Sequence, residues 1–243
     1  MKIYGMTDKG LARKNNQDTF LITNVKNVSL SFVCDGMGGP GGGEIASELA
    51  KESFLSKFSM LYDPSDSINT LKTKITSILN EINKEILHKS FENEELTGMG
   101  TTFVGLITDG DRALVINIGD SRAYLIKNDT ITQITKDHSM VQQLYDEGKI
   151  DKMSMKNHPQ KNIITRALGA YEYIEPDFYE LKLKKGDSIL LCSDGLSNTV
   201  DEKEILFEVT TGSSVENTIK QLIEIANKRG GLDNITAVLL CVI

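Results

Sequence analysis

The sequence has few cysteines, no long apolar run and no excess of basic residues, and each shortage excludes a class of protein. Its three cysteines lie far apart inside apolar segments, without CxxC pairs or the spacing of a soft-metal site. We therefore expect buried, reduced thiols. No run approaches the eighteen or so apolar residues of a membrane span. Residues 1–16 also lack the apolar core of a signal peptide.

The charge balance is acidic. The chain has 34 Asp and Glu against 27 Lys and Arg, which gives a net charge of −7. This balance argues against a general nucleic-acid binder, and the sequence has no block of like charges typical of an interaction tail. With 243 residues, 40% of them apolar, the chain is long enough for one large domain or two small ones. We expect a globular protein that stays in the cytoplasm, without membrane contact.

Apolar patterning predicts several short strands with helices between them. The expected strands cover residues 2–7, 18–23, 28–35, 102–108, 113–118, 123–127, 130–134, 174–183, 187–193 and 235–243. Apolar residues at three- and four-residue steps predict helices around 45–53, 68–86 and 215–226, with a further helix before the last of these and a short one from about 138 to 147. Glycines 41–43 are expected to be a flexible entry to the first helix.

The connections between the central strands are two or three residues long, at 109–111, 119–121 and 128–129. Such short turns favour antiparallel hairpins over crossover helices. Because the strands are apolar on both faces, they need cover on both sides. The economical arrangement is an α+β fold of four layers, α-β-β-α, with two mainly antiparallel sheets packed face to face and flanked by helices. No natural linker is visible, so we expect a single domain over residues 1–243, with an irregular excursion around 146–166.

Two apolar runs end in an Asp-Gly pair. Residues 30–34 lead into Asp35-Gly36, and residues 189–192 lead through Ser193 into Asp194-Gly195. Each pattern is typical of a buried strand followed by a turn that glycine permits, which places a carboxylate at a rigid strand end. Three more aspartates stand beside Gly, Asn or a strand end: Asp18, Asp120 and Asp233.

If these five carboxylates converge, their charges need compensation. Two carboxylates about 4 Å apart repel by roughly 4 kcal/mol even at an effective dielectric near 20. No cluster of Lys or Arg adjoins them in the sequence, so shared protons or bound cations remain. Oxygen ligands without His or Cys select hard ions, Mg²⁺ or Mn²⁺ first and Ca²⁺ second.

A carboxylate-held metal pair suits phosphoryl chemistry, in which a water attacks in line and the ions neutralise the developing charge. Such a site also needs a cation for the phosphate. Arg13, five residues before Asp18, has the planar guanidinium suited to bidentate phosphate binding. Taken singly, each Asp is better explained as a turn former and Arg13 as an exposed surface charge. The hypothesis rests on all of them together.

Seven short motifs follow one another along nearly the whole chain. They are Arg13 with Asn16-Gln17-Asp18, Asp35-Gly36-Met37-Gly38-Gly39, Gly100-Thr101-Thr102, Gly119-Asp120-Ser121-Arg122, Asp137-His138-Ser139, Ser193-Asp194-Gly195-Leu196 and Gly231-Leu232-Asp233-Asn234-Ile235-Thr236. In this order they resemble the metal-dependent Ser/Thr protein phosphatases, the PPM or protein phosphatase 2C family, in their compact bacterial form. The resemblance implies the same four-layer fold and the hydrolysis of phosphoserine and phosphothreonine on proteins.

The resemblance also implies a set of ligands for two Mn²⁺ or Mg²⁺ ions. Asp35 should bridge both ions. Asp194 and Asp233 should complete the shell of the first ion. The Gly36 carbonyl should ligate the second ion, with Asp18 acting largely through bound water.

Further roles follow from the same resemblance. Asp120 matches the residue that, with Asp194, holds a third and weaker ion in bacterial members. Arg13 matches the arginine that binds the substrate phosphate. The stretch from about Asp146 to Arg166 matches a flap beside the active site, where substrate selection is expected. The implied partners are phosphorylated proteins, including a bacterial Ser/Thr kinase that the phosphatase opposes, and a monomer is expected.

The sequence departs from the family pattern at two positions. Met37 stands where the eukaryotic branch has a histidine thought to protonate the leaving group, and Pro40 stands where many bacterial members have another histidine. A methionine donates no proton, so any general acid must be another group. His138 and His158 match family positions, and we expect a structural turn at each.

Two other functions remain open on the sequence alone. A catalytically silent relative would serve as a regulatory or binding module, and such relatives usually lack one or more of the metal carboxylates. An aspartyl-phosphate hydrolase built on a parallel sheet also places its nucleophile after an apolar strand. That chemistry calls for a second Asp two places on, where this chain has Met37.

Overall fold

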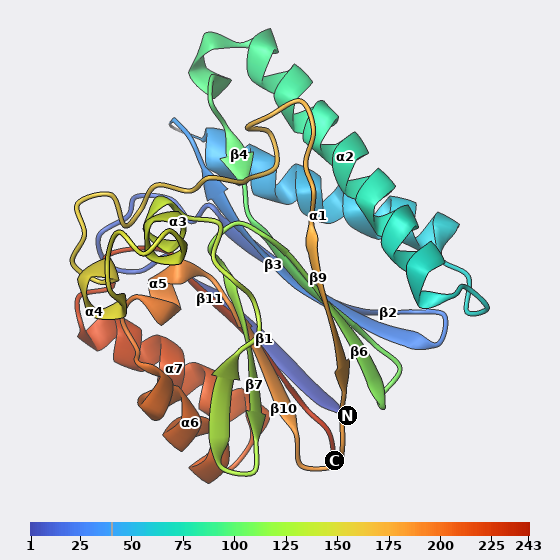
Figure 1. The fold of residues 1–243 in the computed structure, drawn as a ribbon, viewed down its shortest axis with the longest axis vertical. Coiled ribbons are helices and arrows are strands. Elements are labelled where there is room, and N and C mark those ends of the chain that lie inside the picture. Colours follow the sequence, from blue (N-terminus) through green and yellow to red (C-terminus); the bar gives the residue numbers. More distant parts are fainter. Residues whose placement is uncertain (40) are drawn as a thin grey trace.

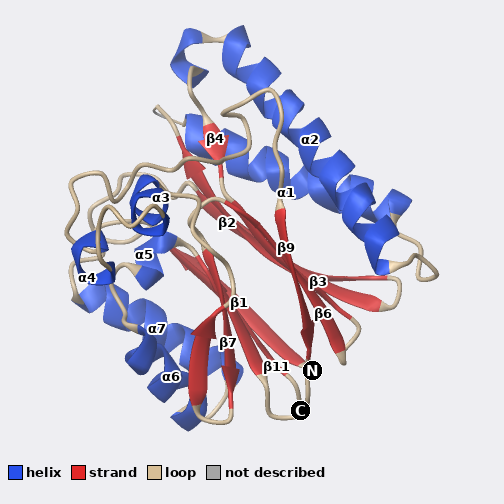
Figure 2. Ribbon diagram, viewed as in Figure 1, coloured by secondary structure: helices blue, strands red, loops and turns tan. Residues whose placement is uncertain are grey.

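The computed structural model describes residues 1–39 and 41–243 and has four layers (Figures 1 and 2). One sheet runs in the order β1 (Lys2–Asp8), β11 (Ile235–Cys241), β10 (Ser188–Cys192), β7 (Arg122–Lys127) and β8 (Thr130–Gln133). The second runs in the order β2 (Asp18–Val25), β3 (Val28–Met37), β5 (Phe103–Thr108), β6 (Arg112–Ile118) and β9 (Asp177–Lys182), with β4 (Gly100–Thr101) paired to β3. The pairings between these described strands are antiparallel.

Helices cover the outer face of each sheet (Figure 2). The helices α1 (Gly42–Leu61) and α2 (Ile68–Glu92) pack on the second sheet, while α6 (Glu202–Thr211) and α7 (Val215–Lys228) pack on the first. The short helices α3 (Met140–Asp146), α4 (Lys152–Met155) and α5 (Asp194–Ser197) gather at one end, together with the loops between them. The 3₁₀ turn η1 (Glu94–Leu96) follows α2. The predicted α+β fold with α-β-β-α layers is confirmed.

Three separate hydrophobic cores, one under each helical layer and one between the sheets, explain why the strands are apolar at successive positions. On β3, Phe32 faces α1 and packs on Phe54, whereas its neighbour Val33 points into the core between the two sheets. On β10, Leu190 faces α7 and Leu191 faces the other sheet. A central strand of each sheet is thus covered on both faces, so apolar residues occupy both alternating positions.

One predicted hairpin is wrong. The turns at 109–111 and 128–129 join neighbouring strands as expected, but the turn at 119–121 carries the chain from β6 in one sheet to β7 in the other. Gly119 lies at φ +110°, and a Cβ there would come 2.6 Å from the Thr102 side chain. Short length alone does not distinguish this sheet-to-sheet crossing from a hairpin.

The glycines at the start of α1 also differ from expectation. Gly42 and Gly43 are the first residues of the helix itself rather than a flexible entry. The helix α4 lies within the predicted excursion at 146–166. In the part of the chain that the structure describes, no helix is both long enough and apolar enough to cross a membrane.

Candidate metal centre and active site

The predicted site residues meet at one end of the sandwich, and both sheets contribute to it. Asp18 begins β2 and lies directly opposite Asp35 on β3. Asp194 begins α5 just after β10, Asp233 precedes β11, and Asp120 lies in the crossing between the sheets. The chain termini lie at the other end (Figure 1). All five aspartates therefore lie near one another, and the charges of the other four act on Asp35.

Hydrogen bonds between the Asp35 backbone and the Gly100-Thr101-Thr102 motif fix the position of Asp35. The Asp35 amide donates to Thr102 Oγ1 at 3.0 Å, and the Thr102 amide donates to the Asp35 carbonyl at 2.9 Å. Thr101 Oγ1 donates to the same carbonyl at 3.0 Å. The Thr102 hydroxyl also lies 2.7 Å from that of Ser121, next to Asp120. This hydroxyl pair links the strand of Asp35 to the crossing that bears Asp120.

The two Asp-Gly pairs are not the free turns that the sequence predicts. Gly36 is still part of β3, and Gly195 lies within α5. Neither glycine is needed for a positive φ. A Cβ on Gly36 would instead lie 2.1 Å from the Gly43 carbonyl oxygen, and one on Gly195 would lie 2.0 Å from the Asn234 carbonyl oxygen. Close approach of two backbones, rather than a turn, requires glycine at both positions.

The buried carboxylate of Asp18 has one satisfied oxygen and one unsatisfied oxygen. Its Oδ2 accepts hydrogen bonds of 2.7 Å from Ser193 Oγ and Thr236 Oγ1. Its Oδ1 has no hydrogen-bond partner among the described residues, and the same is true of Oδ1 of buried Asp120. Burial, opposed by the two hydroxyls and supported by nearby negative charge, raises the pKa of Asp18 to about 7. Buried carboxylate oxygens without a donor are suited to contact with a cation.

The pKa values of the other central carboxyls are also raised. Burial first, and then the charges of Asp18 and Asp194, raise the pKa of Asp35 well above its usual range. Burial and the charge of Asp233 raise the pKa of Asp194 to about 6, against the positive charge of Arg122, which lowers it. Burial and Asp194 also raise the pKa of Asp120. Bound cations would relieve the repulsion among these carboxyls.

Arg13 lies at the edge of the cluster. Its Nη2 forms a 2.7 Å ion pair with Asp233 Oδ2, and the side chain is 52% exposed. The charges of Asp35 and Asp194 also act on Arg13, and with the Asp233 hydrogen bond they raise its pKa. The guanidinium is thus held next to the carboxylates and remains open to solvent, as a phosphate-binding group requires.

Asn234 joins the first and last motifs, a role that its place in the sequence does not indicate. Its Oδ1 accepts from the Gln17 amide at 2.9 Å, and its Nδ2 donates to the carbonyls of Lys9 and Asn15 at 2.8 and 3.0 Å. The loop that bears Arg13 is therefore anchored beside Asp233. Ser193 and Thr236, the two donors to Asp18, likewise have no role that motif spacing predicts. Asn234 lies over 200 residues away in sequence from the loop it anchors, so spacing alone could not reveal these contacts.

The donor set fits hard divalent ions. The groups are aspartate oxygens and the Gly36 carbonyl, which suit Mg²⁺ and Mn²⁺ rather than soft metals. Across residues 1–39 and 41–243, no three His, Cys, Asp or Glu side chains stand in an arrangement that could hold an ion by themselves. A complete metal shell here would need backbone carbonyl and water oxygens as well, as is usual for Mg²⁺.

The histidines and Met37 occupy structural positions. His138 is buried, accepts at Nδ1 from the Gly119 amide at 3.0 Å, and places Nε2 3.2 Å from Asp177. His158 Nδ1 accepts from the Gln160 amide in a local turn. Met37 ends β3, paired with Gly100. Pro40 lies outside the described residues.

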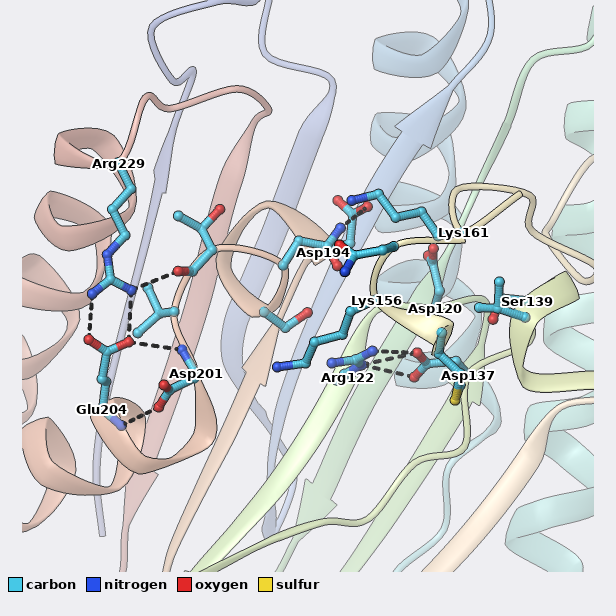
Figure 3. A pocket seen from close by; sticks show the side chains of 17 residues that line it. Asp120, Arg122, Asp137, Ser139, Lys156, Lys161, Asp194, Asp201, Glu204 and Arg229 are labelled. Atoms are coloured by element: carbon cyan, nitrogen blue, oxygen red, sulfur yellow. Dashed lines mark hydrogen bonds and ion pairs between the residues drawn. The ribbon is translucent and has the colours of Figure 1, made fainter. Parts of the chain in front are cut away.

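A cleft of about 400 Å³ adjoins the carboxylates, between α4, α5 and α6. Figure 3 shows Asp120 and Asp194 on one side of it, with Lys156 and Lys161 extending across from the predicted flap region. Two arginines in the lining are already paired: Arg122 binds Asp137 through two nitrogens, and Arg229 binds Glu204. The cleft is polar and charged.

Known proteins resemble this chain over nearly its full length. Residues 12–239 match the family model described as "Protein phosphatase 2C". A serine/threonine phosphatase stp from Listeria welshimeri is 37% identical over 96% of this chain and 93% of its own length. The protein phosphatase PhpP of Streptococcus pneumoniae is 37% identical over 99% of this chain and 97% of its own length.

Solved structures agree with the sequence comparisons. The serine/threonine phosphatase of S. agalactiae superposes with a TM-score of 0.94 at 32% identity, covering 100% of this chain and 99% of that one. The catalytic domain of the phosphatase PstP, determined in complex with two manganese ions, superposes with a TM-score of 0.84 at 35% identity, covering 98% and 96%. With the motifs in order and the aspartates gathered at one end of a four-layer sandwich, this chain belongs to the protein phosphatase 2C family.

Proposed function

We propose that this protein serine/threonine phosphatase hydrolyses phosphoserine and phosphothreonine by in-line attack of water at a centre for two Mn²⁺ or Mg²⁺ ions. The observation that carries the proposal is the convergence of five aspartates and Arg13 from both sheets, with two buried carboxylate oxygens left without partners. When bound, two such ions would activate a water and neutralise the charge that develops on the phosphoryl group.

The proposed ligands are those implied by the family resemblance. Asp35 would serve both ions, Asp194 and Asp233 would hold the first, and the Gly36 carbonyl would hold the second, with Asp18 acting largely through bound water. The mutual repulsion that raises the pKa of Asp35 and Asp194 supports this assignment, because bound cations relieve it. The orphaned Oδ1 of Asp120, close to Asp194, supports a third and weaker ion there.

The remaining roles fall to residues at the edge of the centre. Arg13 binds the substrate phosphate, because its guanidinium is half exposed and fixed by Asp233. Met37 supplies no proton, so the leaving group is protonated by another group. The region around 146–166, whose Lys156 and Lys161 line the cleft, acts as the flap that selects substrates.

We further propose that residues 1–243 act as one phosphatase domain, as a cytoplasmic monomer that opposes a bacterial Ser/Thr kinase. An aspartyl-phosphate hydrolase on a parallel sheet is excluded by the antiparallel neighbours of β3 and β10. A silent binding module is not favoured, since the five aspartates are present and the relatives compared are phosphatases.

The decisive experiment replaces Asp35. We expect Asp35→Ala to abolish Mn²⁺-dependent hydrolysis of a phosphothreonine peptide and to weaken Mn²⁺ binding measured by calorimetry. The matched control is Glu52→Ala, which removes an exposed carboxylate from α1, and it should keep both properties. Unchanged turnover in Asp35→Ala would refute the two-metal proposal.

A further inference from the structure

Two leucines beside Arg13 are unusually exposed for large apolar side chains. Leu11 is 72% exposed and Leu232 is 75% exposed. They come from the loops before β2 and before β11, the same loops that bear Arg13 and Asp233. A single exposed leucine needs no explanation, but a pair at the edge of a catalytic centre does.

The two loops are fixed to each other, so the leucines have a defined place. The amides of Leu11 and Ala12 both donate to the Gly231 carbonyl, at 2.8 and 3.0 Å. A Cβ on Gly231 would lie 3.0 Å from Leu11 Cγ, so the Leu11 side chain lies over the residue next to Leu232. The ion pair of Arg13 with Asp233 adds a third link.

The position of this pair determines what it can meet. Leu11 is two residues from Arg13, a span of at most about 7 Å, and Leu232 directly precedes Asp233. Side chains next to a phosphorylated residue bound by Arg13 would therefore lie within reach of these two loops. Of the described residues, none from 9–16 or 230–234 lines the charged cleft of Figure 3. The two exposed leucines thus lie outside the charged cleft, on loops whose other exposed residues include Lys9, Arg13 and Lys14.

We propose that Leu11 and Leu232 form an apolar rim that selects substrates with an aliphatic or aromatic side chain close to the phosphorylated residue. The inference rests on the proposed function and on Arg13 as its phosphate-binding group. The occupant is the substrate segment itself, because the leucines are continuous with the site where its phosphate binds. Burial of an apolar side chain against them favours binding by the hydrophobic effect.

The test uses phosphothreonine peptides in which each of the three positions on either side of the phosphothreonine is Leu or the near-isosteric Asn. With Mn²⁺ and the full chain, we expect Leu at one or more positions to raise kcat/KM about tenfold, mainly through KM. In the double variant Leu11→Asn/Leu232→Asn this preference should fall below about twofold. The matched control is Met60→Gln, which removes a 78% exposed apolar side chain near the far end of α1, and it should keep the tenfold preference.

The outcomes separate the two proposals. A tenfold preference that persists in the double variant, or equal rates for Leu and Asn at every position in the wild-type protein, overturns the apolar rim alone. A wild-type protein that hydrolyses none of the peptides refutes the proposed function and this inference with it. The single variants Leu11→Asn and Leu232→Asn should each lose part of the preference, which tests the rim without relying on the double substitution.

Discussion

At the scale of single residues, the two oxygens of Asp18 have different tasks. Oδ2 is occupied by the hydroxyls of Ser193 and Thr236, and these bonds lower the pKa of a carboxyl that burial raises to about 7. Oδ1 has no partner in the described structure. The hydroxyls therefore keep the carboxyl closer to its ionised form and leave one oxygen available to the proposed metal centre, as partners of metal-site groups commonly do.

This arrangement predicts the effect of Thr236→Val. Loss of the hydroxyl raises the pKa of Asp18 further, so near neutral pH more of this carboxyl is protonated and binding must displace the proton. We expect about tenfold weaker Mn²⁺ binding by calorimetry at pH 7. The deficit should shrink as pH rises, because the carboxyl then ionises in both proteins.

The control for that experiment is Thr218→Val, the same substitution at a buried threonine on α7 whose hydroxyl donates to the Glu208 carbonyl. Its Mn²⁺ affinity should equal that of the wild-type protein. Equal affinities in the Thr236 and Thr218 variants would show that the hydroxyl has no influence on the centre.

At the scale of secondary-structure elements, local sequence patterns predict the elements that depend on local sequence and miss those that depend on distant contacts. The helix α2 was predicted because its apolar residues recur at helical spacing, and its start is capped by Ser67, which accepts from the Thr70 amide. The sheet crossing at 119–121 and the one-turn helix α5 were not predicted. Both depend on contacts between distant segments: Gly119 with Thr102, and Gly195 with Asn234.

The candidate site likewise contains residues that the sequence identifies and residues that only the folded structure reveals. The five aspartates and Arg13 could be named from the sequence, because motif order and hard-ion chemistry single them out. The residues that position them could not, since Asp18 meets Ser193 and Thr236 only after the two sheets pack together. The predicted turn at Asp35-Gly36 is wrong, because Gly36 permits close backbone contact within β3.

The segment after β8 gives a prediction about pH. His138 accepts the Gly119 amide at Nδ1, so the ring must be neutral to keep that bond. Burial lowers the pKa of His138 against the opposing effect of Asp177. The unfolded chain therefore binds this proton more readily, and the contribution of His138 to stability is lost as pH falls below about 6.5.

We expect His138→Asn to remove that part of the pH dependence. The measurement is the free energy of unfolding by denaturant between pH 5 and 8, compared with the wild-type protein. The groups facing the ring, Asp137, Asp177 and Arg166, are unchanged in the variant, so the difference isolates His138. The control is His88→Asn on the exposed surface of α2, which should retain the wild-type profile. A His138 variant that loses stability below pH 6.5 as steeply as the wild-type protein would contradict the assignment.

At the scale of the whole molecule, the centre lies where the two sheets meet. Asp18 and Asp35 come from one sheet, and Asp194 and Asp233 come from segments that flank β10 and β11 in the other. Their mutual repulsion acts across the interface between the sheets. Ions that bind these carboxylates therefore link the two halves of the sandwich and relieve the repulsion at the same time.

Metal binding should for this reason stabilise the whole fold. A ligand that binds only the folded state adds RT ln(1 + [L]/Kd), about 2.7 kcal/mol at a concentration a hundred times Kd. For a chain of this size, that free energy corresponds to an increase in Tm of about 5–10 °C. We expect Mn²⁺ to produce such an increase relative to EDTA at matched ionic strength. In Asp35→Asn the increase should largely vanish, whereas Glu52→Gln, which removes an exposed charge from α1, should keep it. An equal increase in Asp35→Asn would mean that Mn²⁺ stabilises the protein from some other place, and that the two sheets do not share the metal centre.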